Sequence, residues 1–211
     1  MAERFSFEAT ARGVRRVRFD AGADVVARGG RRHVERARRE LAEYLRGERS
    51  YFSVPLDLGE LPPFQATVLA QARRIRFGDV DSYAAIARRI GHPHAARAVG
   101  NALGANPAPI LVPCHRVVRS DGTWGHFAFG GAMKTALLAL ERATPALVGS
   151  TTTRIACWRG CPHERRIRGD RRVTFRSSAD ARRAGYRPCR VCCPDPLSGP
   201  QQRRADDRSR T

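Results

Sequence analysis

The sequence predicts three structured parts: an N-terminal α/β domain, a largely α-helical middle domain, and a small α+β module rich in cysteine. Short runs over 4–26 alternate between apolar and polar residues, which is the period of strands. Helical patterns of apolar residues then recur over 33–143, and five of the six cysteines lie between residues 157 and 193. We expect domains at 1–58, 59–145 and 154–194, a linker at 146–153, and a disordered tail at 195–211.

The N-terminal domain is predicted to contain short strands followed by one helix. Phe5–Phe7 and Val14–Val17 alternate apolar and polar side chains. Residues 33–46 place apolar side chains on one helical face and Arg and Glu on the other, and Gly47 follows as a helix stop. Residues 55–63, bounded by prolines, are expected to form a loop.

The middle domain is predicted to contain a series of short helices. The expected helices cover 64–76, 83–90 with Ser82 as N-cap, 93–103 and 131–143, and a short apolar strand is expected at Ile110–Val112. Two short helices joined by a Gly-His-Pro turn form a helix-turn-helix arrangement. Such hairpins are usually packing units, but the charge of this chain favours binding to DNA.

The chain carries a large excess of positive charge. Lys and Arg total 39 against 20 Asp and Glu, giving a formal net charge of +19, and Lys134 is the single lysine. This excess favours a polyanionic partner, most simply nucleic acid, and argues against basic partners. The preference for Arg over Lys is also what a compositional bias of the source genome would produce.

The sequence carries no apparent targeting segment. No stretch approaches the about 20 apolar residues of a membrane helix, and the first residues lack the basic-then-apolar pattern of a secretory signal. We therefore expect a cytoplasmic protein with no membrane partner and with reduced thiols.

Cys114 stands apart from the other cysteines, in the run Pro113–Val118. A lone cysteine is most often a small buried hydrophobe. Catalysis would need the thiolate, because the thiol is a poor nucleophile. His115 is adjacent, but neighbours in an extended chain point to opposite faces, so a water relay or a bent backbone would have to connect them.

Further motifs surround this cysteine in a fixed order. They are Phe64-Gln65, Gly78-Asp-Val-Asp-Ser-Tyr83, Arg97-Ala-Val-Gly100, Asn106-Pro107, Pro113-Cys-His-Arg-Val117, and the helix from Phe129-Gly130 to Glu141. Together they closely resemble the O6-alkylguanine-DNA alkyltransferases, also called methylated-DNA–protein-cysteine methyltransferases. The resemblance is strong over about 59–143 and looser over 1–58. It implies an RNase H-like N-terminal α/β domain and a winged helix-turn-helix-like alkyltransferase domain.

The resemblance implies a role for each matched residue of the reaction centre. Cys114 would accept the alkyl group from O6 of guanine as a stable thioether, and His115 would act as the base through water. Glu141 would hold and polarise His115, while Asn106 would order the turn that carries the cysteine. These roles follow the general logic of a nucleophile, a base and an orienting group.

The target atom lies inside the duplex, so the guanine must be rotated out of the base stack. The resemblance implies that Arg97 takes the place of the extruded base. Tyr83 would press on the adjacent phosphate or base and would supply the proton that lets guanine leave as a neutral species. We expect further DNA contacts from His94, Ala95 and Arg116. The expected partner is double-stranded DNA containing O6-alkylguanine, bound by a monomer.

The loop Gly125-His-Phe-Ala-Phe-Gly-Gly131 departs from the usual pattern of the family. Phe127 stands where a Tyr is common, and Ala128 offers no side-chain donor to O6. Recognition of guanine would then rest on backbone groups and apolar walls.

The C-terminal cysteines have the spacing of a metal site. Cys157-x3-Cys161 and Cys189-x2-Cys192 form two close pairs, and each pair can supply two ligands of one tetrahedral Zn²⁺ ion. A module of this size would also need a metal to fold, which predicts a zinc-stabilised α+β module. Cys193 is spare, and His163 is a possible substitute ligand.

This segment also resembles the zinc-binding domain of the bacterial adaptive-response protein, Ada. The matching runs are Cys157-Trp-Arg-Gly-Cys161-Pro and Ala184-Gly-Tyr-Arg-Pro-Cys189-Arg-Val-Cys192. In that family the first of the four cysteines accepts a methyl group from a DNA phosphotriester, which makes Cys157 the candidate second acceptor. Plain anchoring to DNA is the alternative role. Ada carries this module at its N-terminus, ahead of a regulatory region that has no counterpart here, so we do not expect transcriptional switching.

Three functions are compatible with these motifs. The first is a single-turnover DNA repair transferase, and the second is a non-catalytic alkyl-damage sensor or DNA-binding regulatory protein. The third is a cysteine hydrolase that uses Cys114 and His115. The presence of Cys114 disfavours the sensor, whose relatives replace the nucleophile. Nothing in the sequence indicates an acyl pocket, which disfavours the hydrolase.

Overall fold

The structure is a computed structural model that describes residues 4–20, 22–121, 123–143 and 146–192. The chain divides into two compact units, Met1–Ala42 with Val54–Ala139, and Glu43–Ser53 with Leu140–Thr211. The expected boundary at residue 58 therefore falls inside the first unit. Cys193 and the expected disordered tail lie outside the described residues.

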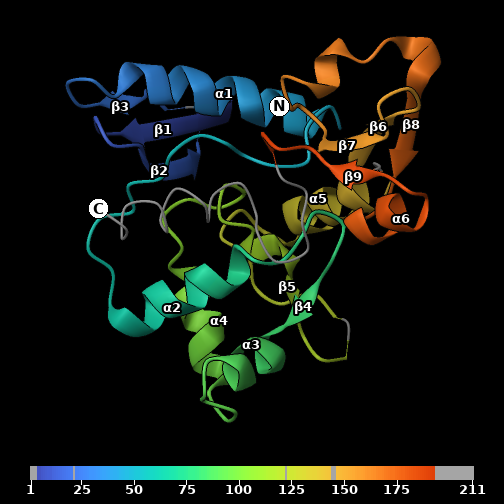
Figure 1. The fold of residues 1–211 in the computed structure, drawn as a ribbon. Coiled ribbons are helices and arrows are strands. Elements are labelled where there is room, and N and C mark those ends of the chain that lie inside the picture. Colours follow the sequence, from blue (N-terminus) through green and yellow to red (C-terminus); the bar gives the residue numbers. More distant parts are fainter. Residues whose placement is uncertain (1–3, 21, 122, 144–145, 193–211) are drawn as a thin grey trace, which may run out of the picture. The chain divides into compact units, whose positions relative to one another are not determined.

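The first unit begins with a three-stranded sheet and a helix. Strands β1 (Phe5–Ala9) and β2 (Val14–Phe19) pair antiparallel, and β3 (Val25–Val26) pairs parallel with β1. Figure 1 shows helix α1 (Arg31–Leu45) lying along this sheet, and Arg38 of α1 donates a hydrogen bond to the carbonyl of Phe5. The strands and the helix predicted for this part of the chain are confirmed.

Three short helices of the first unit pack against one another. They are α2 (Pro63–Ala72), α3 (Tyr83–Arg89) and α4 (Ala96–Gly104). The predicted N-cap of α3 is confirmed, because the backbone N–H of Ala85 donates to Ser82 Oγ at 3.0 Å. Helix α4 begins three residues later than predicted, since the chain makes a turn from His92 to Ala95.

Two short strands and a long helix complete this part of the fold. Strand β4 (Asp81–Ser82) pairs parallel with β5 (Val117–Val118), which follows a 3-10 turn over Cys114–Arg116. Helix α5 (Gly131–Ala143) confirms the helix predicted at 131–143. The strand predicted at Ile110–Val112 is wrong: Ile110 has a φ of 74°, and the chain turns back so that Pro109 bridges Val112.

The second unit is built on a four-stranded sheet in the order β8-β6-β7-β9. Its elements are β6 (Leu147–Ser150), β7 (Ile155–Trp158), β8 (Arg172–Phe175), α6 (Ser178–Arg183) and β9 (Arg187–Pro188), with 3-10 turns at Glu164–Arg166 and Gly169–Arg171. The expected linker at 146–153 is wrong, because β6 is fully buried and pairs antiparallel with both β7 and β8. A run without charged residues is equally consistent with a buried central strand.

The segment Glu43–Ser53 folds with this second sheet. Ser50 Oγ donates to the carbonyl of Ala146 at 2.7 Å, and Arg159 Nε donates to the carbonyl of Gly47 at 2.8 Å. A buried ion pair joins Arg49 to Glu43 at 2.8 Å. The last turn of α1 and the loop after it are therefore part of the cysteine-rich unit.

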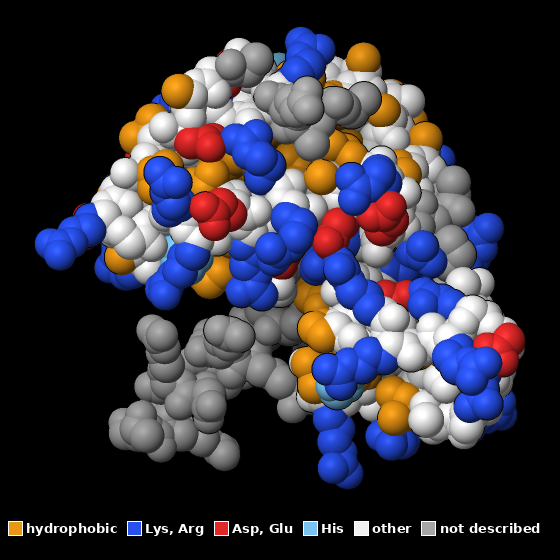
Figure 2. Space-filling view, turned by 90° about the horizontal axis from the view of Figure 1, so that it is seen from above, with side chains coloured by type: hydrophobic (Ala, Val, Ile, Leu, Met, Phe, Trp, Pro, Cys, Tyr) orange, Lys and Arg blue, Asp and Glu red, His pale blue; other side chains and the backbone are white. Residues whose placement is uncertain are grey.

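Basic side chains cover much of the surface, with few acidic side chains among them in the view of Figure 2. Residues 154–211 carry +10 of the net charge of +19. Among the helices of the described residues, none combines the length and the apolar character that crossing a membrane requires.

Candidate functional site

Cys114 lies in a turn that Asn106 holds in place. Asn106 Nδ2 donates to Cys114 Sγ at 3.0 Å and to the carbonyl of Val112 at 3.1 Å, while its Oδ1 accepts from the backbone N–H of Ala108 at 3.0 Å. The side chain of Asn106 is itself buried. One amide therefore fixes both ends of the turn and the sulfur, which agrees with the role expected of Asn106.

The turn forms because its residues cannot continue as a strand. Ile110 takes a left-handed backbone conformation, which is uncommon for a β-branched residue. Pro113 has no N–H to donate, and the N–H of Cys114 bonds instead to the carbonyl of Val112 at 2.8 Å. The backbone thus bends at the cysteine, and the opposite-face argument for an extended chain does not apply here.

The thiol of Cys114 is strongly desolvated. Its side chain is 4% exposed, and burial raises its pKa to about 11, against the lowering effects of the Asn106 hydrogen bond and of the positive charge of Lys134. A thiol with this pKa stays protonated at neutral pH. Attack by the sulfur therefore needs a group that removes the proton as the reaction proceeds.

Lys134 is a buried cation that the sequence analysis did not assign to the site. It is fully buried in α5, and its Nζ donates to the carbonyls of Val117 at 2.6 Å and of Gly125 at 3.5 Å. Burial lowers the pKa of Lys134 to about 8, while the neighbouring Cys114 acts to raise it. The spacing could have revealed it, since position 134 lies on the same helical face as Leu137, Leu138 and Glu141.

Tyr83 lies close to both of these groups. Its ring is 5.8 Å from Lys134 Nζ, and its pKa is raised by burial and by the charge of Cys114. Its hydroxyl donates to the carbonyl of His126 at 3.4 Å. Gly125 makes room for it, because a Cβ at that position would lie 2.1 Å from Tyr83 Oη. The structure therefore brings Tyr83, Cys114, Asn106 and Lys134 into one site.

His115 and Glu141 are both buried, but they belong to different units. His115 is fully buried in the first unit, and its ring meets Phe127 edge-on with centroids 6.1 Å apart. Glu141 is 2% exposed in the second unit and accepts a hydrogen bond from Tyr44 Oη at 2.6 Å. Its action on His115 stays a prediction.

The residues expected to contact DNA divide into two sets. His94 and Arg97 are exposed and Ala95 is partly exposed, all at the start of α4. Within the described part of the chain, Arg97 makes neither a hydrogen bond nor an ion pair, so its guanidinium is available to a ligand. Arg116 is different: it is 7% exposed and donates to the carbonyl of Ile75 at 2.8 Å. Its guanidinium is thus bonded within the protein in this structure, and the DNA contact expected of Arg116 stays a prediction.

The four predicted metal ligands meet in one cluster. The sulfurs of Cys157, Cys161, Cys189 and Cys192 all lie within 4.8 Å of one another, and all four residues are buried. Tetrahedral Zn–S bonds of about 2.3 Å place sulfurs about 3.8 Å apart, which is close to this spacing. Hydrogen bonds with neighbouring cysteines lower the pKa of Cys161, while the hydrogen bond with Cys161 together with burial raises the pKa of Cys157. A dication would stabilise all four thiolates together, so the residues present fit Zn²⁺.

Contacts from N–H groups distinguish the four sulfurs. The backbone N–H of Trp158 donates to Cys192 Sγ at 3.3 Å, and the backbone of His163 donates to Cys161. His163 Nδ1 lies 3.7 Å from Cys189 Sγ, which places it beside a ligand rather than in the ligand set. Across the ranges that the structure describes, no N–H group donates to Cys157 Sγ.

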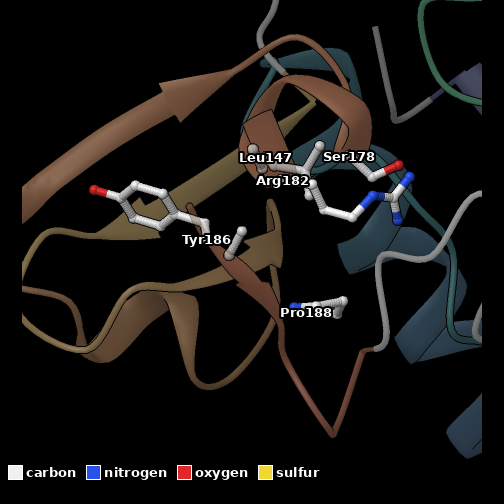
Figure 3. Close-up of a pocket in the computed structure, with 7 residues that line it drawn as sticks. Leu147, Ser178, Arg182, Tyr186 and Pro188 are labelled. Carbon is white, nitrogen blue, oxygen red and sulfur yellow. The ribbon is translucent and has the colours of Figure 1, made fainter. Parts of the chain in front are cut away.

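A shallow pocket of the second unit lies between α6 and the sheet (Figure 3). It is lined by Leu147, Ala156, Ser178, Ala181, Arg182, Tyr186 and Pro188. The lining side chains pack so closely that no water molecule fits between them. This pocket is therefore not a ligand site.

Comparisons with known proteins match both parts of the chain. The family "6-O-methylguanine DNA methyltransferase, DNA binding domain" matches residues 63–143, and "Metal binding domain of Ada" matches residues 141–195. The methylated-DNA–protein-cysteine methyltransferase of Mus musculus is 44% identical over 108 residues, which is 48% of this chain and 51% of the mouse protein. The probable methyltransferase of Acanthamoeba polyphaga mimivirus is 46% identical over 48% of this chain and 68% of that protein. The chain thus spans about half the length of the mouse protein and 57% of the inducible Bacillus subtilis protein.

Solved structures of methylguanine methyltransferases have a fold similar to that of this chain. The Mycobacterium tuberculosis O6-methylguanine methyltransferase matches with a TM-score of 0.56 and 31% identity, over 66% of this chain and 92% of that chain. A structure of the M. tuberculosis protein in complex with DNA matches with a TM-score of 0.55 and 32% identity, over 67% of this chain and 95% of that chain. The fold, the ordered motifs around Cys114 and these identities agree, and the chain belongs to the methylated-DNA–protein-cysteine methyltransferase family.

Proposed function

We propose that this chain repairs DNA by moving an alkyl group, such as methyl, from O6 of guanine to Cys114 in a single turnover. The observation that carries this proposal is the Cys114 sulfur itself, held by Asn106 in a buried turn beside Tyr83 and Lys134. The related M. tuberculosis protein has been solved with DNA, which supports DNA as the partner, and we propose that this DNA is double-stranded.

The transfer step is a displacement at the alkyl carbon. The sulfur of Cys114 attacks this carbon, a C–S bond forms, and the C–O6 bond breaks with its electron pair passing to guanine. The thiol proton leaves through water to His115, which Glu141 orients. Guanine takes up a proton from Tyr83 and stays in the DNA as a neutral base, and the proton held by His115 returns through water to Tyr83. The thioether cannot be hydrolysed by this site, so each molecule of protein acts once.

The elements around the site provide the access that this chemistry needs. We infer that α4 enters the duplex and that Arg97, which has no described partner, fills the space left by the rotated guanine. His94 and Ala95 contact the neighbouring DNA. Lys134 stabilises negative charge that develops on Cys114 during the attack.

The experiment that tests this proposal follows the DNA. A duplex with one O6-methylguanine is incubated with an excess of the protein, and its bases are quantified after digestion. We expect O6-methylguanine to be converted to guanine by the wild-type chain and to persist with Cys114→Ser. Binding without conversion by the wild-type chain would favour the damage sensor instead.

We also propose that the C-terminal module holds Zn²⁺ through its four cysteines, anchors DNA, and accepts a methyl group from a phosphotriester at Cys157. The zinc would keep the four sulfurs ionised at neutral pH. Among the described residues no N–H group donates to Cys157 Sγ, whereas Cys192 Sγ accepts from the backbone N–H of Trp158 and Cys161 from the backbone of His163. Such donors reduce the electron density of a thiolate. All four cysteines are equally buried, so DNA would have to reach Cys157 through a local opening.

Duplex DNA with one methyl phosphotriester and no O6-methylguanine tests this second activity. We expect one methyl group on the peptide that contains Cys157, and none after Cys157→Ser. A methyl group on another cysteine, or no transfer together with normal DNA binding, would leave the module as an anchor.

Finer points of architecture and location belong to the same proposal. We expect the N-terminal domain to be RNase H-like and the alkyltransferase domain to be a winged helix-turn-helix. The protein would act as a monomer in the cytoplasm, a reducing compartment in which four free thiols can hold zinc.

A further inference from the structure

Gly160 lies in the turn between two of the metal ligands, Cys157 and Cys161, and buried charged side chains bond to both of its backbone polar groups. Its N–H donates to Glu164 Oε2 at 3.2 Å, and its carbonyl accepts from Arg49 Nη2 at 3.4 Å. Arg49 and Glu164 are each 5% exposed, so water competes little with either bond. The turn between the two ligands is therefore held from both sides.

The turn also needs a glycine at this position. Gly160 has a φ of 85°, a left-handed conformation that glycine adopts without strain. A Cβ there would lie 3.0 Å from Arg49 Cζ, which shows that the guanidinium lies directly against the turn. A side chain at position 160 would strain the backbone and push against this guanidinium.

The two side chains that hold the turn are themselves paired with opposite charges. Arg49 Nε donates to Glu43 Oε2 at 2.8 Å, and Arg165 donates to the other oxygen of Glu43 at 2.5 Å. Glu164 forms an ion pair with Arg172. Burial acts to raise the pKa of Glu43, but the hydrogen bonds from Arg165 and Arg49 outweigh it and lower the pKa. Glu43 therefore stays ionised at neutral pH and keeps Arg49 in place.

Arg49 comes from a part of the chain far from the cysteines. It lies 111 positions before Gly160 and outside residues 141–195, which match the metal-binding domain. Within its own segment, Arg49 Nη1 donates to the carbonyl of Tyr51 at 3.2 Å, which keeps the guanidinium in one orientation. The cysteine-rich unit thus uses an arginine that the matched domain does not contain.

We propose that Arg49 and Glu164 are positioning residues of the metal site, which hold Cys157 and Cys161 in the arrangement in which both bind one Zn²⁺ ion. The inference rests on the zinc site of the proposed function and on neither methyl transfer. A ligand pair that is already in place loses less conformational entropy when the metal binds. Contacts of this kind, one step away from the ligands, typically change metal affinity by about 10–100-fold.

The charge of this network acts in the same direction. The network contains three arginines and two carboxylates, so it carries an excess of positive charge. A zinc ion held by four thiolates has a net negative charge. The excess positive charge next to the turn therefore stabilises the loaded site.

The test measures zinc affinity first. Arg49→Met removes the guanidinium, keeps an unbranched side chain in its place, and leaves Glu43 paired with Arg165. We expect the dissociation constant for Zn²⁺, measured by competition with a chelator, to rise about tenfold. Arg46→Met is the matched control, because Arg46 lies in the same segment but pairs with Glu48 at the surface. It should bind zinc as tightly as the wild type does.

Hydrogen exchange of the zinc-loaded protein separates positioning from a general loss of stability. If Arg49 acts on the turn, Arg49→Met speeds exchange over 158–164 and leaves β8 and α6 as protected as in the wild type. If the contact is only structural, exchange speeds up across the whole cysteine-rich unit, and the inference is overturned.

Glu164→Gln provides a second variant in case Arg49→Met does not fold. The amide oxygen of Gln can still accept from the N–H of Gly160, but it lacks the charge that pairs with Arg172. We expect the dissociation constant for zinc to rise severalfold, with the faster exchange again confined to 158–164. Wild-type affinity and wild-type protection in this variant would overturn the inference.

Failure of this inference and failure of the proposed function give different results. Wild-type zinc affinity in Arg49→Met overturns the positioning role and leaves the zinc site intact. A wild-type chain that holds no zinc overturns both. None of these measurements depends on methyl transfer, so the alkyl transfer to Cys114 stands or falls separately.

Discussion

At the scale of single residues, the site holds Cys114 as a buried thiol whose raised pKa keeps it protonated, next to groups that lower this pKa. Burial raises the pKa of Cys114 to about 11, while Asn106 and Lys134 act in the opposite direction. The thiol is therefore poorly reactive until a base takes its proton. In the proposed function, this protects a nucleophile that acts once from unwanted reaction. In the free protein the reactivity of Cys114 should therefore increase with pH.

The free protein should show this suppression directly. At pH 7 about one Cys114 thiol in 10⁴ would be ionised. We expect the alkylation rate of Cys114 by iodoacetamide to rise close to tenfold for each pH unit between pH 7 and 10. Peptide mass spectrometry resolves Cys114 from the zinc-module cysteines. A rate that levels off below pH 8 would contradict the raised pKa.

The sequence predicted the reacting residues better than the residues around them. Cys114 and Asn106 were identified from an ordered set of motifs, and the structure brings them into contact. Lys134 was missed because a lysine is rarely fully buried, so its helical position was not weighed. The burial of Arg116, whose guanidinium donates to the carbonyl of Ile75, depends on contacts between distant loops and could not be predicted from its position beside Cys114.

At the scale of elements, the loop before α5 packs closely against Tyr83, the first residue of α3, at Gly125. A Cβ on Gly125 would lie 2.1 Å from Tyr83 Oη and within 2.6 Å of two ring carbons. Because the overlap is with the rigid ring as well as with its hydroxyl, the tyrosine would have to move. The placement of Tyr83 therefore depends on the absence of a side chain at position 125.

Gly125→Ala should displace Tyr83 and slow the reaction. We expect the rate of transfer from duplex DNA to fall about tenfold or more, because a displaced Tyr83 could not perform the roles proposed for it in rotating the base and donating a proton. The measurement is a single-turnover time course.

Gly104→Ala serves as the control, because a Cβ there meets nothing within 4 Å. It lies in α4 and should keep the wild-type rate, with a gain of about 0.5–1 kcal/mol in the free energy of unfolding. Equal rates for the two glycine variants would rule out the proposed dependence on Gly125.

The elements with clear periodicity were predicted correctly, and those whose conformation depends on distant contacts were not. Helices α1 and α5 and strands β1 and β2 have regular apolar spacing, and each appears close to its predicted bounds. The apolar run Ile110–Val112 has the pattern of a strand. The side chain of Asn106 accepts from the N–H of Ala108 and donates to the carbonyl of Val112, and these two hydrogen bonds stabilise a turn instead. The uncharged residues 146–153 were predicted to be a linker. Their own sequence does not show that they form a strand, because the strands that pair with them, β7 and β8, lie further along the chain.

At the scale of the whole molecule, the metal site and the end of α1 belong to one folded unit. Three hydrogen bonds hold segment 43–53. Its Arg49 donates to the carbonyl of Gly160, its Ser50 donates to the carbonyl of Ala146, and its Gly47 carbonyl accepts from Arg159. Gly160 lies between two metal ligands, Cys157 and Cys161. The order of this segment, and with it the position of Tyr44, should therefore depend on the metal.

Removing the metal should loosen segment 43–53. In small zinc modules the metal supplies most of the folding free energy, about 10–16 kcal/mol. After treatment with a chelator, we expect faster hydrogen exchange in 43–53 and in β6–β9, a lower midpoint of thermal unfolding, and unchanged exchange in β1 and β2. Hydrogen exchange read by mass spectrometry measures all three regions in one experiment.

Two cysteine variants sharpen this prediction. Cys189→Ser should lose zinc and reproduce the exchange pattern of the chelated protein, whereas Cys114→Ser should keep about one zinc per chain. Full protection of 43–53 in zinc-free protein would contradict the link between the metal site and α1.

The central claim is that Cys114 is the acceptor of the alkyl group, and the most direct test locates that group on the protein. The wild-type chain is incubated with an excess of duplex containing O6-methylguanine, digested, and analysed by mass spectrometry. We predict one methyl group on the peptide that contains Cys114, with the amount reaching one per chain and no further. An unmodified Cys114 in protein that has bound the duplex, or repair that continues beyond one event per chain, would contradict the account.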